Sequence, residues 1–209
     1  MKTGDGPQAR EPGSVPTRIT GVILAGGQGS RMGGVDKGLQ AFRGKPMVQH
    51  VIERLAPQVD ELLINANRNP DAYAGFGYRV VADEIEGFAG PLAGFERGLA
   101  HAAGDVVVTA PCDSPFLPAD LVRRLLDALE AKGADLAVAK TGSQAHPVFS
   151  LMRRSVHGSL RDFLSGGQRK IDRWYGALAV VEVAFDDEAD AFLNINTLDE
   201  LTGLERSRA

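Results

Sequence analysis

The sequence is poor in cysteine and lacks long hydrophobic runs. Cys112 is its only cysteine, so an internal disulfide and a cysteine-rich metal site are both excluded. This cysteine usage suits a reducing compartment, and we expect a cytoplasmic protein. No apolar run reaches the ~18 residues that a membrane span needs, and no apolar stretch follows the charges of the first residues. We therefore expect neither a membrane partner nor a signal peptide.

An excess of positive charge is also absent. Lys and Arg number 23 against 27 Asp and Glu, which gives a formal net charge of −4. Nucleic-acid coats need a cationic field, so we expect no nucleic-acid partner. The 209 residues are enough for one domain, at roughly 100–200 residues per domain. Residues 1–17 are Gly, Pro and polar side chains without a period, which predicts a disordered tail ahead of a single domain over 18–209.

Apolar patterns predict strands that alternate with helices. The predicted strands are Ile19–Leu24, Leu62–Ile64, Tyr78–Ala82, Val106–Val108, Leu136–Ala139, Pro147–Leu151 and Ala177–Phe185. Helices are predicted from Pro46 to Leu55, over 90–103, along the stripe that follows Pro118, and from a capping box at Thr197 to about 204. Continuously apolar strands between helices indicate an α/β fold with a mostly parallel central sheet in three α/β/α layers.

Polar or small residues stand where four of the predicted strands end. They are Gly26, Asn65, Asp83 and Asp113. The carboxyl ends of parallel strands lie at one edge of a sheet, and ligands bind beyond that edge. We therefore predict that these four residues gather there.

What the sequence has in abundance is glycine, and the glycines cluster after the first predicted strand. Residues 24–37 read LAGGQGSRMGGVDK and hold five of the 25 glycines. Glycine lets backbone N–H groups approach a ligand closely, and successive N–H groups form a concavity that binds anions. Arg31 and Lys37 add positive charge, so the loop suits a polyphosphate. It matches neither the P-loop, which needs Gly-Lys-Ser/Thr, nor the dinucleotide fingerprint, because Met32 replaces the third glycine.

The loop resembles that of nucleotidyltransferases, and the chain as a whole is most similar to the molybdenum cofactor guanylyltransferase family. The family pattern LAGGxxxRMGGxDK is matched through Lys37. The resemblance continues in order through the following segments: Gly44-Lys45-Pro46, Asn65-Ala66-Asn67-Arg68, Gly90-Pro91-Leu92-Ala93-Gly94, Pro111-Cys112-Asp113-Ser114-Pro115, His146-Pro147 and Asn194-Ile195-Asn196-Thr197. It implies a Rossmann-like nucleotidyltransferase fold over roughly 19–204.

The resemblance also implies a reaction and a set of site residues. The family joins the GMP part of GTP to the terminal phosphate of molybdenum-molybdopterin, releases pyrophosphate and needs Mg²⁺. By similarity, the nucleotide-binding residues are Leu24, Ala25, Gly26, Gly27, Lys37, Asn65, Asp83 and Asp113. Lys37 binds the phosphates, Asp113 holds both Mg²⁺ and nucleotide, and Asn194 and Asn196 lie near the metal and the acceptor. Candidate protein partners are molybdenum-insertion proteins and molybdoenzyme chaperones.

These residue types fit nucleotidyl transfer. The attacking phosphate is already ionised, so catalysis needs positioning and charge neutralisation rather than a base. Mg²⁺ usually takes one or two protein carboxylates, which Asp113 can supply. Arg31 and Lys37 complete the catalytic set, with Arg31 expected to face the leaving phosphates because a guanidinium binds two oxygens at once. Gly26 lacks a Cβ and thereby leaves room for guanine, whereas cytidylyltransferase relatives tend to have Ala there.

Alternatives remain open at this point. A cytidylyltransferase acting on the same acceptor, a sugar-phosphate nucleotidyltransferase of the same fold, and a non-catalytic nucleotide-binding module share many of these features. On the acceptor side, His146 either lines the pocket or forms a structural turn. Trp174 and Tyr175 either stack on the pterin or pack as core. The basic residues between Arg153 and Arg173 are either a solvated face or a landing site for an anion or a partner, and the acidic run from Asp186 to Glu188 is expected to be a solvated loop.

Overall fold

The computed structural model describes residues 17–25, 27, 36–84 and 90–193. The predicted N-terminal tail (apart from its last residue) and the predicted last helix from Thr197 lie outside these ranges. Among the described residues, no helix is both long and apolar enough to cross a membrane.

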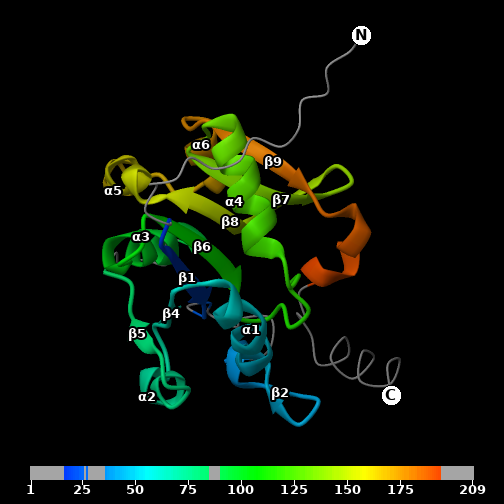
Figure 1. Ribbon diagram of the computed structural model, residues 1–209. Helices are drawn as coiled ribbons and strands as arrows, with labels where there is room; N and C mark the ends of the chain where they lie inside the picture. The colour runs from blue at the N-terminus through cyan, green and yellow to red at the C-terminus, as the bar shows by residue number, and fades with distance from the viewer. Residues whose placement is uncertain (1–16, 26, 28–35, 85–89, 194–209) are drawn as a thin grey trace.

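A seven-stranded sheet forms the centre of the described part of the chain (Figure 1). Its strands are β1 (Ile19–Leu24), β4 (Glu61–Asn65), β5 (Arg79–Val81), β6 (Val106–Pro111), β7 (Leu136–Thr141), β8 (Gln144–Arg153) and β9 (Val180–Ala184). Their order across the sheet is β5-β4-β1-β6-β8-β7-β9. Only β8 runs antiparallel to its neighbours. The prediction of a mostly parallel sheet is thus confirmed.

Helices cover both faces of this sheet and make the three predicted layers (Figure 1). One face packs against α1 (Met47–Leu55) and α4 (Leu121–Lys132). The other packs against α3 (Pro91–His101), α5 (His157–Ser165) and α6 (Ile171–Tyr175). Successive strand residues point to opposite faces, so Val106 and Val108 enter the first core and Val107 enters the second. This explains why Val106, Val107 and Val108 are all apolar instead of alternating with polar residues.

Short elements join these layers. A hairpin of β2 (Ala41–Phe42) and β3 (Lys45–Pro46) turns through Arg43 and Gly44, whose φ angles of 50° and 80° are typical of a type I′ turn. The other short elements are α2 (Pro70–Ala74) and the 3₁₀ helices η2 (Lys37–Leu39), η3 (Ala56–Gln58), η4 (Arg154–Val156) and η5 (Asp186–Phe192).

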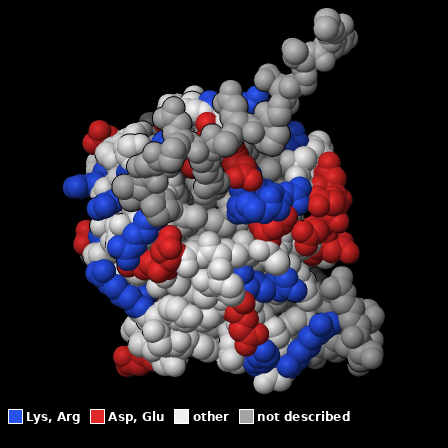
Figure 2. Space-filling view, viewed as in Figure 1, with Lys and Arg blue, Asp and Glu red and all other residues white. Residues whose placement is uncertain are grey.

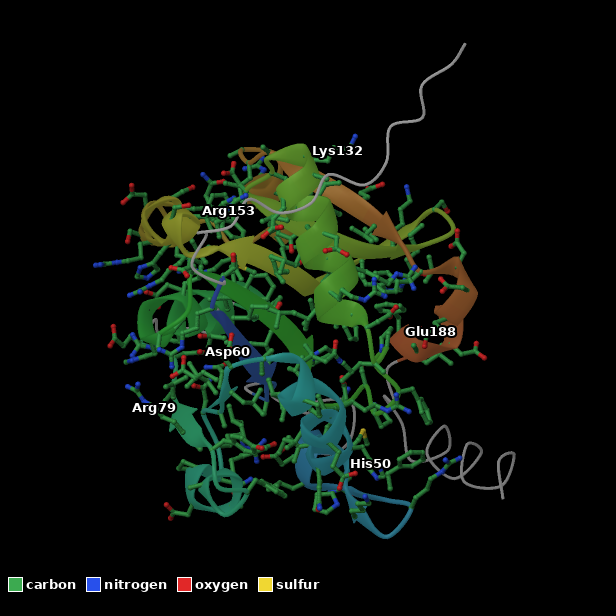
Figure 3. The ribbon with its side chains drawn as sticks, viewed as in Figure 1. His50, Asp60, Arg79, Lys132, Arg153 and Glu188 are labelled. Carbon is green, nitrogen blue, oxygen red and sulfur yellow. The ribbon has the colours of Figure 1, made fainter. Side chains whose placement is uncertain are left out.

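The start of the first helix and the structure of the acidic run were predicted wrongly. The first helix begins at Met47 because Pro46 is extended and pairs with Ala41 in the hairpin. The acidic run expected as a loop is instead part of η5, although its carboxyl groups are exposed as expected. Figure 2 shows acidic side chains gathered over η5, and Figure 3 shows Glu188 at that surface.

Trp174 is part of the core. It is fully buried in α6, and its ring packs edge-on against Phe95 of α3 with centroids 6.4 Å apart. The Tyr175 hydroxyl lies 2.7 Å from the Ser150 hydroxyl and donates to the Pro147 carbonyl oxygen, also at 2.7 Å. Of the two hypotheses for this pair, the structure supports packing rather than stacking on a ligand.

Candidate active site

The carboxyl ends of four neighbouring strands define the candidate site. In the sheet, Leu24 of β1 stands opposite Asn65 of β4 on one side and Pro111 of β6 on the other, while Asn65 stands opposite Val81 of β5. Backbone hydrogen bonds continue one residue further, from Ala25 N–H to the Asn65 carbonyl at 2.8 Å and from Cys112 N–H to the Leu24 carbonyl at 3.1 Å. The chain leaves all four strands at one level.

This register brings Asn65, Asp83 and Asp113 to one edge of the sheet, as expected from the predicted parallel pairing of the strands. Ala25 is buried there beside the half-buried Leu24, and Gly27 is exposed. Gly26 and Arg31 lie outside the described residues.

A lysine and a carboxylate face each other at the end of β6. Lys37, the first residue of η2, donates from Nζ to Oδ2 of Asp113 at 3.2 Å. Their side chains are 20% and 13% exposed, so the pair is largely withdrawn from water. Burial raises the pKa of Asp113, and the charge and hydrogen bond of Lys37 oppose that rise. The arrangement places the Asp113 carboxyl group and the Lys37 amine side by side, although the two residues are 76 positions apart in sequence.

Three amide and carboxylate side chains form a second group on the β4–β5 side. Asn65 donates from Nδ2 to Asp83 at 2.8 Å and to the Val81 carbonyl at 3.2 Å. Asn67 donates to the other Asp83 oxygen at 2.7 Å and accepts from the Asp83 N–H at 2.7 Å. Asn67 belongs to the Asn65-Ala66-Asn67-Arg68 motif, but the sequence indicated no role for it, since its partner lies 16 residues away, just beyond the end of β5. It fixes the Asp83 carboxylate from the side opposite Asn65.

Helix α3 closes over this group at Gly94. A Cβ placed on Gly94 would stand 2.6 Å from Asn65 Oδ1 and 2.6 Å from Leu24 Cδ2. Real Cβ atoms do not come so close, so only glycine lets the first turn of α3 rest on the ends of β1 and β4. Gly90 precedes the helix with a φ of 68°, a conformation that favours glycine.

His146 lies on β8, toward the same edge of the sheet. It pairs with Ala139 at an irregularity of the β7–β8 ladder, and its ring stacks on Phe192 with centroids 4.7 Å apart and planes 14° apart. Its Nε2 is 2.7 Å from the Thr141 hydroxyl. Burial lowers its pKa, so the ring is neutral at physiological pH. These contacts support a packed structural residue; Asn194 and Asn196 lie outside the described residues.

A hollow beside η5 has the wrong charge for a nucleotide. Its lining includes Arg54 and Phe116 together with four acidic residues, Asp186, Asp187, Glu188 and Asp190. Four carboxyl groups repel a triphosphate. The strand ends, with Lys37, remain the better candidate site.

Solved structures with the same architecture include several nucleotidyltransferases. The crystal structure of molybdopterin-guanine dinucleotide biosynthesis protein A from Archaeoglobus fulgidus matches with a TM-score of 0.76 and 26% identity, over 90% of this chain and 97% of that one. A nucleotidyl transferase from Methanothermobacter matches with a TM-score of 0.68 at 21% identity, over 91% and 97% of the two chains, which shows the fold alone. The family model described as a MobA-like NTP transferase domain matches residues 21–181. Fold and site thus define a nucleotidyltransferase.

Curated relatives narrow this class. A molybdenum cofactor guanylyltransferase from Cupriavidus necator is 58% identical over 188 residues, which is 88% of this chain and 94% of the relative. One from Shewanella putrefaciens is 52% identical over 186 residues, or 89% and 95% of the two chains. The chain belongs to the molybdenum cofactor guanylyltransferase family.

Proposed function

We propose that this chain transfers the GMP moiety of GTP to the terminal phosphate of molybdenum-molybdopterin and so forms the molybdopterin guanine dinucleotide cofactor. The observation that carries the proposal is the Lys37–Asp113 pair at the carboxyl edge of the sheet. The chain is also similar to guanylyltransferases along most of its length. A nucleotidyltransferase needs a cation for phosphate oxygens and a carboxylate for a metal, and this pair supplies both within one hydrogen bond.

The reaction places few demands on the side chains. An ionised oxygen of the acceptor phosphate forms a bond to the α-phosphorus of GTP, while the bond from that phosphorus to the bridging α–β oxygen breaks. The electron pair of the broken bond leaves with pyrophosphate, so no protein group has to remove a proton. Lys37 and Arg31 bind and neutralise the phosphate oxygens, which carry more negative charge as the bond breaks.

Asp113 fits a magnesium ligand. Its carboxylate oxygens are of the type that Mg²⁺ prefers, and the described residues contain no cluster of three His, Cys, Asp or Glu that could hold a metal alone. This sparse donor set is typical of a Mg²⁺ ion that also binds substrate phosphates and waters. Mg²⁺ would supply charge neutralisation at the triphosphate. Lys37 already lies against Asp113, and we propose that it turns to the phosphates when nucleotide and metal enter.

The other site residues divide by their place on the edge. Leu24, Ala25, Gly26 and Gly27 would hold the nucleotide at the end of β1, with Gly26 leaving space for the purine. Asn65 and Asp83 would contact the nucleoside, and the hydrogen bonds from Asn65 to Asp83 and to the Val81 carbonyl favour a fixed geometry before binding. On the acceptor side we propose Asn194 and Asn196, with His146 in a supporting position. We propose a cytoplasmic location, and partners among molybdenum-insertion proteins and molybdoenzyme chaperones.

Nucleotide-dependent thermal denaturation tests the nucleotide half of this proposal. The chain is heated with Mg²⁺ and GTP, CTP, ATP or UTP at equal concentrations. A ligand at ~100 times its Kd stabilises the fold by roughly 2.7 kcal/mol, which is a rise of about 5–10 °C for a chain of this size. We expect a GTP-selective rise that Lys37→Ala abolishes. A CTP-selective rise would instead identify a cytidylyltransferase. In an activity assay, turnover of a sugar 1-phosphate would identify a sugar-phosphate nucleotidyltransferase of the same fold. Nucleotide binding without pyrophosphate release during turnover would leave only a binding module.

A further inference from the structure

Asp36, the residue before Lys37, is held by two side chains from the segment that follows β4. The Tyr73 hydroxyl donates to Asp36 Oδ1 at 2.5 Å. The Asn69 amide donates to Asp36 Oδ2 at 2.9 Å. Both carboxylate oxygens of Asp36 therefore have a fixed donor, one from each side. Nothing in the proposed reaction uses Asp36 directly, so these bonds need another explanation.

Tyr73 also contacts the residue on the other side of Lys37. It is fully buried on α2, and its hydroxyl would be 2.4 Å from a Cβ on Gly38. The same Cβ would be 3.2 Å from Cys112 Sγ, the residue next to Asp113. The backbone of η2 is thus pressed between Tyr73 and the end of β6, at a distance that only glycine allows.

We propose that Asp36, Tyr73 and Asn69 form an anchor that positions Lys37 for the phosphates of the nucleotide. The proposal rests on the proposed function and adds to it three positioning residues that do not touch the substrate. The anchor fixes the backbone on both sides of Lys37, at Asp36 and at Gly38, and so limits where its long side chain can reach. Its Nζ is thereby kept within reach of Asp113 and of the phosphates that Asp113 would bind through Mg²⁺.

The chemistry of the anchor suits a permanent contact. Burial and the nearby Cys112 and Asp36 raise the pKa of the Tyr73 hydroxyl, so it keeps its proton and remains a donor at every physiological pH. A hydrogen bond from a neutral hydroxyl to a carboxylate is short and among the stronger ones in proteins. Asn69 has a left-handed φ of 49°, which aims its side chain from the turn before α2 toward Asp36.

A double-mutant cycle separates this role from a general effect on folding. The Kd of GTP with Mg²⁺ is measured by calorimetry for the unaltered chain, Tyr73→Phe, Lys37→Ala and the double variant. If Tyr73 acts through Lys37, the loss of its hydroxyl matters only while Lys37 is present. We expect Tyr73→Phe to weaken GTP binding about tenfold alone, and less than twofold in the Lys37→Ala background, which corresponds to a coupling of roughly 1 kcal/mol or more.

The chain offers a matched control and a second variant. Tyr175→Phe removes another hydrogen-bonded tyrosine hydroxyl, one bonded to Ser150 and Pro147 instead of the η2 region, and it should leave GTP affinity unchanged. Asn69→Gly removes the other donor to Asp36 without disturbing the core, since Asn69 is exposed and glycine keeps its left-handed backbone. We expect it to weaken GTP binding about threefold, and it replaces Tyr73→Phe as the test if that variant does not fold.

The outcomes are distinct. Equal losses from Tyr73→Phe with and without Lys37, or no loss at all, would overturn the anchor while leaving the proposed function intact. No GTP binding by the unaltered chain would instead overturn the proposed function. A similar loss of GTP affinity in Tyr175→Phe would show that the loss of any hydrogen-bonded tyrosine hydroxyl weakens binding, and would also refute a specific anchor.

Discussion

Replacing Gly94 by alanine tests whether α3 must touch the ends of β1 and β4. The added methyl would stand 2.6 Å from Asn65 Oδ1 and from Leu24 Cδ2. Asn65 is 2% exposed and its amide is already bonded to Asp83 and to the Val81 carbonyl, so it has no free space to move into. Either α3 shifts outward or Asn65 breaks its bonds.

Two effects of opposite sign determine how much Gly94→Ala changes the free energy of unfolding. Alanine is favoured over glycine in a helix by up to about 1 kcal/mol. Overpacking a buried site costs about 1–3 kcal/mol. We expect the cost of overpacking to be the larger effect, with a net loss of about 1–2 kcal/mol in the free energy of unfolding. Because the clash falls on Asn65, GTP affinity should fall as well, by about tenfold if one of its hydrogen bonds is lost.

Gly158 supplies the matched control. It lies in the first turn of α5, is exposed, and has nothing within 4 Å of an added Cβ. Gly158→Ala should leave GTP affinity unchanged and stabilise the chain by up to about 1 kcal/mol, or raise Tm by about 2–4 °C. Thermal unfolding and calorimetric titration of both variants measure these effects. A Gly94→Ala variant that gains stability as Gly158→Ala does, with unchanged GTP affinity, would refute the close contact of α3 with the site.

Asp113, His146 and Arg97 give three further predictions. Asp113→Asn keeps the shape of the side chain but removes its charge, and kcat for GMP transfer should fall on the order of 10²–10³-fold; an unchanged kcat would exclude Asp113 as the metal ligand. Burial lowers the pKa of His146, so the unfolded chain binds the proton more tightly. The stability that its neutral ring contributes is present above the unfolded pKa of 6.5 and is lost as the pH falls through the lowered folded pKa. The Tm of His146→Gln should therefore fall less than the Tm of the unaltered chain when the pH is lowered from about 7.5 to 5.5. An equal fall in the two Tm values would contradict this. Arg97, on α3, pairs at 2.8 Å with the mostly exposed Glu84, next to Asp83. Glu84→Gln should raise KM for GTP by at most about fivefold with kcat unchanged, whereas a fall in kcat alone would contradict a role in holding the Asp83 loop.

The sequence predicted well those features that depend on local pattern. The strands at Ile19–Leu24 and 106–111 are mostly apolar because each is buried on both faces, and this made them easy to recognise. The helix stripes of α1 and α4 were equally clear, since each is long enough to show the helical period. Parallel pairing then placed Asn65 and Asp113 at one edge, although 48 positions (113 − 65) separate them in the chain.

Features that depend on distant partners could not be predicted. Helices α2 and α6 have five residues each, too few to show a period, and they owe their positions to the buried side chains of Tyr73 and Trp174. The Tyr175 hydroxyl donates to the Pro147 carbonyl oxygen, 28 residues away, within the part of β8 where its ladder with β7 is irregular. The anchor on Asp36 likewise joins residues 37 positions apart, and no motif pointed to Tyr73.

Product formation in a defined mixture tests the proposed function most directly. The chain is incubated with Mg²⁺, molybdenum-molybdopterin, and GTP or CTP, and pyrophosphate and the dinucleotide are quantified, the latter by mass spectrometry. We predict one pyrophosphate for each molybdopterin guanine dinucleotide formed, with GTP strongly preferred over CTP and activity lost in Asp113→Asn. Preferential formation of the cytosine dinucleotide, or no pyrophosphate above the level of Asp113→Asn, would contradict a guanylyltransferase.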